Sequence, residues 1–103
     1  MPINLVVKEA QPKTKKRFTA IFRIHKGGKV IKITHFGQRG GKTYIDEGDK
    51  EKRKNYIARH KVREKKFYTD PQRASTLSRF ITWGDKKTLK ENLKDYKKKF
   101  NLD

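Results

Sequence analysis

Some residue types and patterns are missing from this chain of 103 residues. It contains no cysteine, which excludes disulfide bonds, thiolate zinc sites and thiol nucleophiles. No stretch approaches the roughly 20 apolar residues of a transmembrane helix, and residues 1–10 lack the cationic start and long apolar run of a secretion signal. We therefore expect an intracellular protein without an integral membrane segment.

Acidic residues are scarce compared with basic ones. The chain has 11 Asp and Glu against 29 Lys and Arg, so its formal net charge at pH 7 is +18. Because such a charge destabilises a compact state by self-repulsion unless a partner neutralises it, we expect an acidic partner. Nucleic acid is the commonest partner of this kind. An acidic protein surface and peripheral contact with anionic lipid are the alternatives.

The length predicts a single domain over residues 1–103. Its parts are an N-terminal strand with a basic arm at 1–17, a β-hairpin with a further strand at 18–46, and a helical part at 49–103. Strands that precede helices in this way predict an α+β fold. We expect an antiparallel hairpin or meander of three or four short strands, followed by three helices.

Apolar residues alternate or cluster in four short segments of the first half. Residues 3–7 predict a short strand, and residues 18–24 and 30–36 predict the two strands of a hairpin. A glycine-rich loop follows and leads to an expected strand at 42–45. These segments supply the predicted sheet.

The hairpin turn is expected at Gly27 and Gly28, because a glycine pair can adopt the positive φ angles of a two-residue turn. A turn at this pair sets Phe22 opposite Ile33 and Ala20 opposite His35, all on one face. The other face, which includes Phe36, is mixed and could contact solvent or a partner.

Three segments of the second half predict helices. Residues 50–66 contain strong helix formers after an N-cap at Asp49, and Asp70 with Pro71 predicts the start of a helix that ends near Trp83. Thr88 begins a capping-box pattern. An apolar stripe follows it at helical spacing: Leu89, Leu93, Tyr96 and Phe100.

Basic residues concentrate in an arm before the hairpin, along the first predicted helix and at the end of the last one. A solvated helix face is the structural alternative, but the spread of the excess favours polyanion binding. Phe36 and Tyr44 are candidates for base stacking. The expected polyanion-binding residues are Lys13, Lys15, Lys16, Arg17, Lys50, Lys52, Arg53, Lys54, Arg59, Lys61, Arg63, Lys65, Lys66, Lys97, Lys98 and Lys99.

The only acidic cluster consists of Asp46, Glu47, Asp49 and Glu51. It could in principle hold Mg²⁺ for a nuclease, but capping and the helix dipole explain acidic residues at a helix start equally well. Neither a phosphate-binding loop nor a dinucleotide fingerprint is present. We expect no catalysis, no metal and no cofactor.

Several motifs occur in a fixed order from residue 33 to residue 103. They are Thr43-Tyr44, DKEKRKNYIARH at 49–60, Asp70-Pro71, LSRFITW at 77–83, Thr88-Leu89 and DYKKKF at 95–100. This succession resembles a family of small basic proteins of unknown function encoded by nucleocytoplasmic large DNA viruses. The chain departs from that family at 84–89, where the family tends to have a turn containing proline.

The resemblance implies a viral context. A large icosahedral particle needs small proteins that cement its capsomers, and genome packaging also needs basic proteins. We therefore expect a non-enzymatic structural component of the virion, a minor capsid or cement protein that contacts viral capsid proteins and is found in the host cytoplasm or nucleus during infection. The alternative is a sequence-independent nucleic-acid-binding protein of the same virus, and a metal-dependent nuclease is the third.

Overall fold

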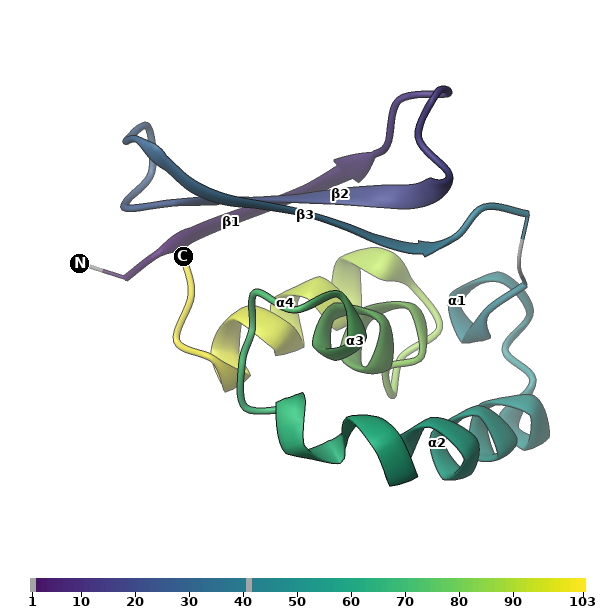
Figure 1. Ribbon diagram of the computed structural model, residues 1–103. Helices are drawn as coiled ribbons and strands as arrows, with labels where there is room; N and C mark the ends of the chain where they lie inside the picture. Colours follow the sequence, from purple (N-terminus) through teal and green to yellow (C-terminus); the bar gives the residue numbers. More distant parts are fainter. Residues whose placement is uncertain (1, 41) are drawn as a thin grey trace.

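The computed structural model describes residues 2–40 and 42–103, and it confirms the predicted α+β class. A sheet, a middle helical layer and an outer helix lie one below another in Figure 1. The sheet contains β1 (Asn4–Glu9), β2 (Lys16–Arg23) and β3 (Val30–Gln38), antiparallel in that order. The helical elements are α1 (Tyr44–Glu47), α2 (Lys50–Glu64), the 3₁₀ helix η1 (Lys65–Phe67), α3 (Ala74–Leu77), the π-helix η2 (Ser78–Thr82) and α4 (Leu89–Lys99).

The turn between β2 and β3 is not the predicted Gly27-Gly28 turn. The Gly28 amide donates to the His25 carbonyl at 2.8 Å, so Lys26 and Gly27 occupy the centre of the turn. Gly27 has a φ of 79°, which glycine adopts without a steric penalty. The loop therefore lies one residue earlier in the chain than expected.

The predicted hairpin register is wrong as a result. Phe22 lies opposite Lys32 rather than Ile33, and Ala20 lies opposite Thr34, after an irregularity next to Phe22. A shift of one residue exchanges the faces of a strand. Phe36 consequently lies on the buried face, and Ile33 lies on the outer one.

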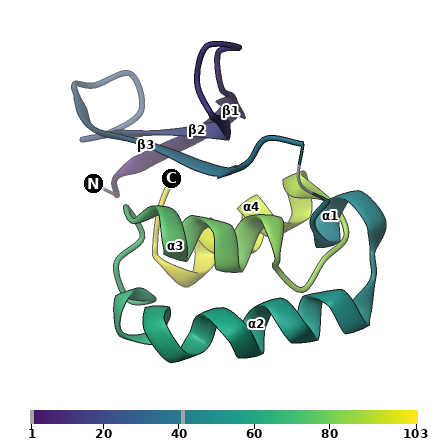
Figure 2. The same ribbon diagram turned by 45° about the vertical axis from the view of Figure 1, so that its right-hand side comes forward.

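The core lies between the inner face of the sheet and the middle helical layer. Residues of α3, η2 and α4 pack there against the aromatic and aliphatic side chains of the strands, and α2 lies farther out (Figure 2). The buried cluster consists of Leu5, Phe18, Ala20, Phe22, Phe36, Leu77, Ile81 and Tyr96. No helix in the described ranges has the length and apolar character needed to cross a bilayer.

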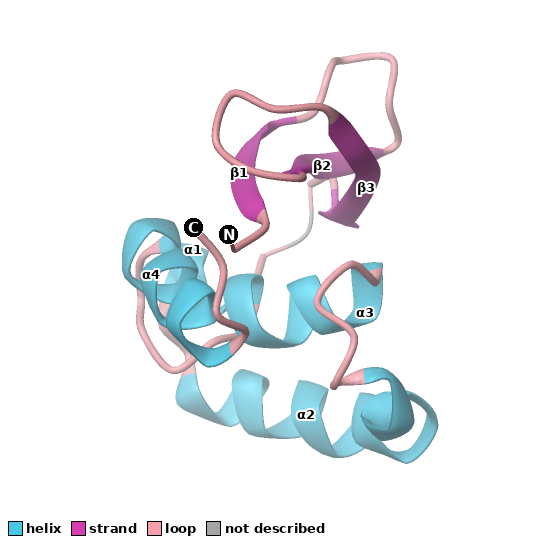
Figure 3. Cartoon of the chain, turned by 90° about the vertical axis from the view of Figure 1, so that its left-hand side faces the viewer, coloured by secondary structure: helices cyan, strands magenta, loops and turns pink. Residues whose placement is uncertain are grey.

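The outer face of the sheet is not covered by any described element (Figure 3). Val6, Ile21 and Ile33 form one row across the three strands. Val6 is 42% exposed and Ile33 is 53% exposed. An apolar row of this kind on an open face is available to a partner.

The strand expected at residues 42–45 is absent, because the chain forms the short helix α1 there. Thr43 and Asp46 make a capping box, in which the Thr43 amide donates to the Asp46 carboxylate at 2.9 Å. Arg17 on β2 donates two further hydrogen bonds of 2.7 Å to the same carboxylate. The capping box and this ion pair connect α1 with the sheet.

The first and last predicted helices are confirmed, and the middle one begins later than predicted. Asp49 caps α2 by accepting two backbone N–H groups, and Thr88 caps α4. Asp70 caps only a turn, because Arg73 has extended backbone angles (φ −87°, ψ 144°) and α3 begins after it. From Ala74 the backbone is continuously helical through α3 and η2 to Thr82, next to the predicted end at Trp83, and the η2 part has π-helical hydrogen bonds.

Candidate functional site

A groove of about 640 Å³ lies between the end of the sheet, α2 and the α3–η2 segment. Its sheet side is lined by Lys16 and by Lys42, which precedes α1. Its second side is α2, and its third side carries the hydroxyl groups of η2 together with Trp83. Three segments that are distant in sequence thus form one basic and polar depression.

Cationic side chains lie along this groove. Lys16, Lys42 and Arg59 are exposed, and the ion pairs within 2–40 and 42–103 do not include any of them. Lys52 is paired with Glu47, at 2.9 Å between the ammonium and a carboxylate oxygen. At least three cationic groups are therefore available to an anionic ligand at this place.

An aromatic stack forms part of the groove wall. The Tyr56 ring lies between two others, with centroid distances of 4.1 Å to His60 and 4.3 Å to Trp83. Burial raises the pKa of the Tyr56 hydroxyl, so this residue is neutral at physiological pH. Trp83 is almost completely buried, whereas about a third of the His60 side chain is exposed.

The π-helix η2 determines how Trp83 enters this stack. The Trp83 amide donates to the Ser78 carbonyl at 2.9 Å, a hydrogen bond across five residues, and the Thr82 hydroxyl donates to the same carbonyl. Such π-turns are frequent at functional sites. Ser78 and Thr82 both line the groove.

Arg53 attaches the beginning of α2 to the segment after η2. Its Nε donates to the carbonyl oxygens of Trp83 and Gly84, at 3.2 and 3.0 Å, and its guanidinium pairs with Asp85. Arg79 donates to the same Trp83 carbonyl. Burial, together with the nearby charge of Arg53, lowers the pKa of Arg79.

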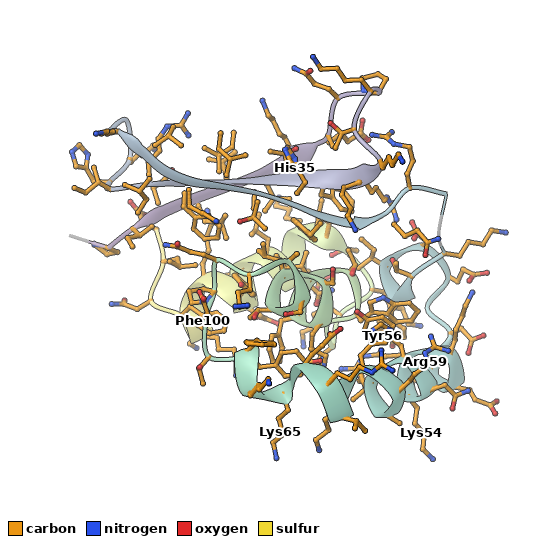
Figure 4. All side chains as sticks on the ribbon, in the orientation of Figure 1. His35, Lys54, Tyr56, Arg59, Lys65 and Phe100 are labelled. Carbon is orange, nitrogen blue, oxygen red and sulfur yellow. The ribbon has the colours of Figure 1, made fainter. Side chains whose placement is uncertain are left out.

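The opposite side of α2 carries a second set of cations. Lys54 and Lys65 point away from the sheet, whereas Tyr56 lies on the side nearer the sheet (Figure 4). Lys61 lies with Lys65 along another shallow depression, and all three lysines are exposed. No residue of α2 is buried, so this helix leaves much of its basic surface free.

Residues 6–60 match a family described as a family of unknown function (DUF5754). The chain belongs to this family. The DUF5754 match extends from β1 into α2 and therefore includes the cations of two groove walls, Lys16, Lys42 and Arg59. The α3–η2 wall lies outside the match. No curated protein and no solved structure matches the chain.

The structure brings together only part of the predicted polyanion-binding set. Lys16, Lys52 and Arg59 meet at the groove. Arg17 and Arg53 instead form ion pairs that connect parts of the fold. The other members lie elsewhere, on the arm, at other positions of α2, on η1 and on α4.

Lys42 and the aromatic stack were not predicted from the sequence. Lys42 stands alone in sequence, and its only local signal is the capping residue Thr43 that follows it. Tyr56, His60 and Trp83 come from two segments of the chain, so their stacking depends on tertiary structure.

The suggested base-stacking residues are inaccessible. Phe36 is 0% exposed and Tyr44 is 5% exposed. Phe36 packs on Phe18 in the core because of the changed hairpin register, and the guanidinium of Arg53 lies over the Tyr44 ring. Neither ring presents a face to a nucleic-acid base, so this prediction is wrong.

The acidic cluster does not form a metal site. Asp46 pairs with Arg17, Glu47 pairs with Lys52, and Asp49 caps α2. Hydrogen bonds from Arg17 lower the pKa of Asp46. In the described part of the chain, no three carboxylate or imidazole groups lie close enough to hold a metal ion. The arrangement gives no support to the nuclease hypothesis.

Proposed function

We propose that the protein binds the phosphate backbone of nucleic acid, without sequence preference and without catalysing a reaction. The observation that carries this proposal is the convergence of Lys16, Lys42 and Arg59 at one groove without carboxylate partners. A net charge of +18 adds long-range attraction to any polyanion. Contacts to phosphate position a protein on nucleic acid but carry no sequence information.

The exposed side of α2 supports the same proposal. Lys54, Lys61 and Lys65 add cationic groups that face solvent. Anionic chains can approach them without displacing any core contact. These lysines therefore add to the general attraction of a strand that is bound at the groove.

Salt dependence tests this proposal. Fluorescence anisotropy with labelled single-stranded and double-stranded DNA of unrelated sequences should give similar affinities between sequences. The logarithm of the affinity should fall linearly with the logarithm of salt concentration. The slope should be about −0.7 to −0.9 for each phosphate contacted. Absence of binding at low salt would reject the proposal.

A second candidate function is that of a structural component of a large DNA virus particle. The observation that favours it is the open apolar row formed by Val6, Ile21 and Ile33. Lys8 and Arg23 lie at its borders. This surface fits a viral capsid protein that has an apolar centre and an acidic rim.

Locating the protein in the particle tests this second candidate. If the protein is a minor capsid or cement protein, mass spectrometry should detect it in purified particles both before and after their DNA is removed. Loss of the protein together with the genome would favour nucleic-acid binding instead. Flotation with anionic vesicles distinguishes peripheral lipid contact from both, because only that contact carries the protein to the top of the gradient.

A further inference from the structure

We propose that the groove between the sheet, α2 and η2 is a binding site for one nucleoside phosphate unit of an unpaired strand or of a free nucleotide. This inference rests on the proposed function. The phosphate lies near Lys16, Lys42 and Arg59, and the base packs against the His60–Tyr56–Trp83 stack. The outer α2 lysines then contribute only general attraction.

The charges along the groove orient such a ligand. Lys52 lies near the beginning of α2 and Glu64 lies at its end, and both line the groove. At about 1.5 Å per residue, these two positions are about 18 Å apart along the helix. Glu47 offsets the charge of Lys52, so the phosphate is attracted by Lys16, Lys42 and Arg59 and repelled by the Glu64 carboxylate at the end of α2.

The stack provides a face for the base. One side of the Tyr56 ring is covered by Trp83 and the other side by His60, so His60 is the outer member. The Glu64 carboxylate accepts a hydrogen bond from His60 Nδ1 at 3.0 Å, which holds the orientation of the imidazole ring. Bases stack on flat rings of this kind with little dependence on their identity.

The size and polarity of the groove favour an unpaired nucleotide. A volume of about 640 Å³ lies within the range of about 300 to 1,000 Å³ typical of small-ligand sites. Asn55 and Ser75 line the groove and offer an amide and a hydroxyl group to a base edge. A base within a duplex is already stacked and paired, and extracting it costs a few kcal/mol.

The chain contains a built-in reporter for this site. Trp83 is its only tryptophan, and it lines the groove. Its fluorescence should change when a thymidine oligonucleotide binds, and less at equal concentration of a duplex. Separate titrations with a nucleoside monophosphate and with inorganic phosphate distinguish a free nucleotide from a strand and from phosphate alone.

Two variants with the same change in charge separate the groove from general electrostatics. The groove variant carries Lys16→Gln, Lys42→Gln and Arg59→Gln. The control carries Lys54→Gln, Lys61→Gln and Lys65→Gln. All six side chains are exposed, so both variants should keep the circular dichroism spectrum and melting temperature of the native protein. The groove variant should lose at least about tenfold more affinity for the oligonucleotide than the control.

The outcomes separate this inference from the proposed function. Equal losses in the two variants, or binding without a change in Trp83 fluorescence, would overturn the groove site and leave nucleic-acid binding intact. Inorganic phosphate that binds as tightly as the nucleotide would overturn the contact with the base. Absence of any binding by the native protein would reject both proposals together.

Discussion

The helices α2 and α4 are both rich in lysine and both begin with a side-chain N-cap, yet they are attached to the molecule in different ways. In α4, Asn92 and Tyr96 are about 1% exposed and belong to the interior. In α2 no residue is buried. The comparison indicates that α4 stabilises the fold, whereas α2 is held at the surface with most of its cations free for a partner.

Several independent contacts hold α4. Its Asn92 side chain forms three hydrogen bonds with the backbone of Ile81 and Lys86, and the Tyr96 hydroxyl donates to Pro71 O at 2.6 Å. Beyond the helix, the Asp103 amide donates to a carbonyl at the start of β1, so the end of the chain pairs with the sheet edge (Figure 3).

Fewer contacts hold α2. Arg53 binds the carbonyls after η2, and Tyr56 stacks on Trp83. The ion pair of Arg53 with the largely exposed Asp85 adds little stability, because water screens it. A cation that faced the core would need a buried partner, so a helix that presents many cations cannot also bury much of its surface.

The largest expected effect is that of Asn92→Ala. The substitution removes three hydrogen bonds to the backbone of Ile81 and Lys86, and the one accepted by the Ile81 carbonyl is buried. We expect the free energy of unfolding to fall by about 3 kcal/mol in urea denaturation. The exposed Asp95 on the same helix provides the control, since Asp95→Ala should change it by less than about 0.5 kcal/mol. Equal effects would contradict the role assigned to α4.

Gly84→Ala tests the close approach of the loop to α4. A Cβ atom at Gly84 would overlap the Phe80 carbonyl oxygen and lie 2.6 Å from Asn92 Cγ. We expect the free energy of unfolding to fall by about 2 kcal/mol in urea denaturation. Gly27→Ala is the matched control, because its space is open and only its positive φ of 79° causes strain, about 1 kcal/mol. A smaller loss at Gly84 than at Gly27 would show that the loop can move away from α4.

Alkaline pH compares one tyrosine of each helix. Burial raises the pKa of both Tyr56 and Tyr96, so in the folded protein they keep their protons above the pH, about 10, at which unfolded tyrosine ionises. The stability that the two protonated tyrosines contribute is therefore fully present below that pH. Above it this stability decreases by up to about 1.4 kcal/mol per pH unit for each residue. The free energy of unfolding, measured by denaturation between about pH 9 and pH 11, should decrease less steeply with pH for Tyr96→Phe and for Tyr56→Phe than for the native protein. Identical slopes would mean that the hydroxyls ionise equally in both states.

The smallest expected effect is that of Arg53→Gln. This substitution weakens the attachment of α2 to the segment after η2 but leaves the core unchanged. We expect the free energy of opening of α2 to fall by about 1 kcal/mol. Amide hydrogens of α2 should then exchange faster, while those of α4 keep their protection. Lys54→Gln, at the neighbouring exposed position, should change neither helix. Faster exchange in both helices after Arg53→Gln would mean that they open as one unit.

Local signals predicted the beginnings of α2 and α4 and the apolar stripe of α4 correctly. Asp49 and Thr88 act on backbone groups within three residues, so their roles can be derived without tertiary structure. Asn92 was not expected in the interior, because a polar residue is buried only where partners from other segments meet it. Those partners are the carbonyl of Ile81 in η2 and the carbonyl and amide of Lys86 in the loop before α4.

The hairpin shows why register was harder to predict than the presence of strands. The apolar runs indicated β2 and β3, but either of two turns around Gly27 is compatible with them. The turn centred on Lys26 and Gly27 prevailed together with an irregularity next to Phe22, and it placed Phe36 in the core. The energy of burying that ring is a property of the assembled layers, which local propensity does not include.

The sequence by itself determined that the protein has a large positive charge, no thiol chemistry and an order of strands before helices. These properties depend only on which residues are present and on how they are spaced along the chain. Only the tertiary structure decided which cations lie together. Lys16, Lys42 and Arg59 line one groove because α1 and α2 fold back beneath the end of the sheet, and Arg17 and Arg53 are taken up by ion pairs in the same arrangement. The reason is physical: charge is additive along a chain, whereas a binding site requires short distances between residues that are far apart in sequence.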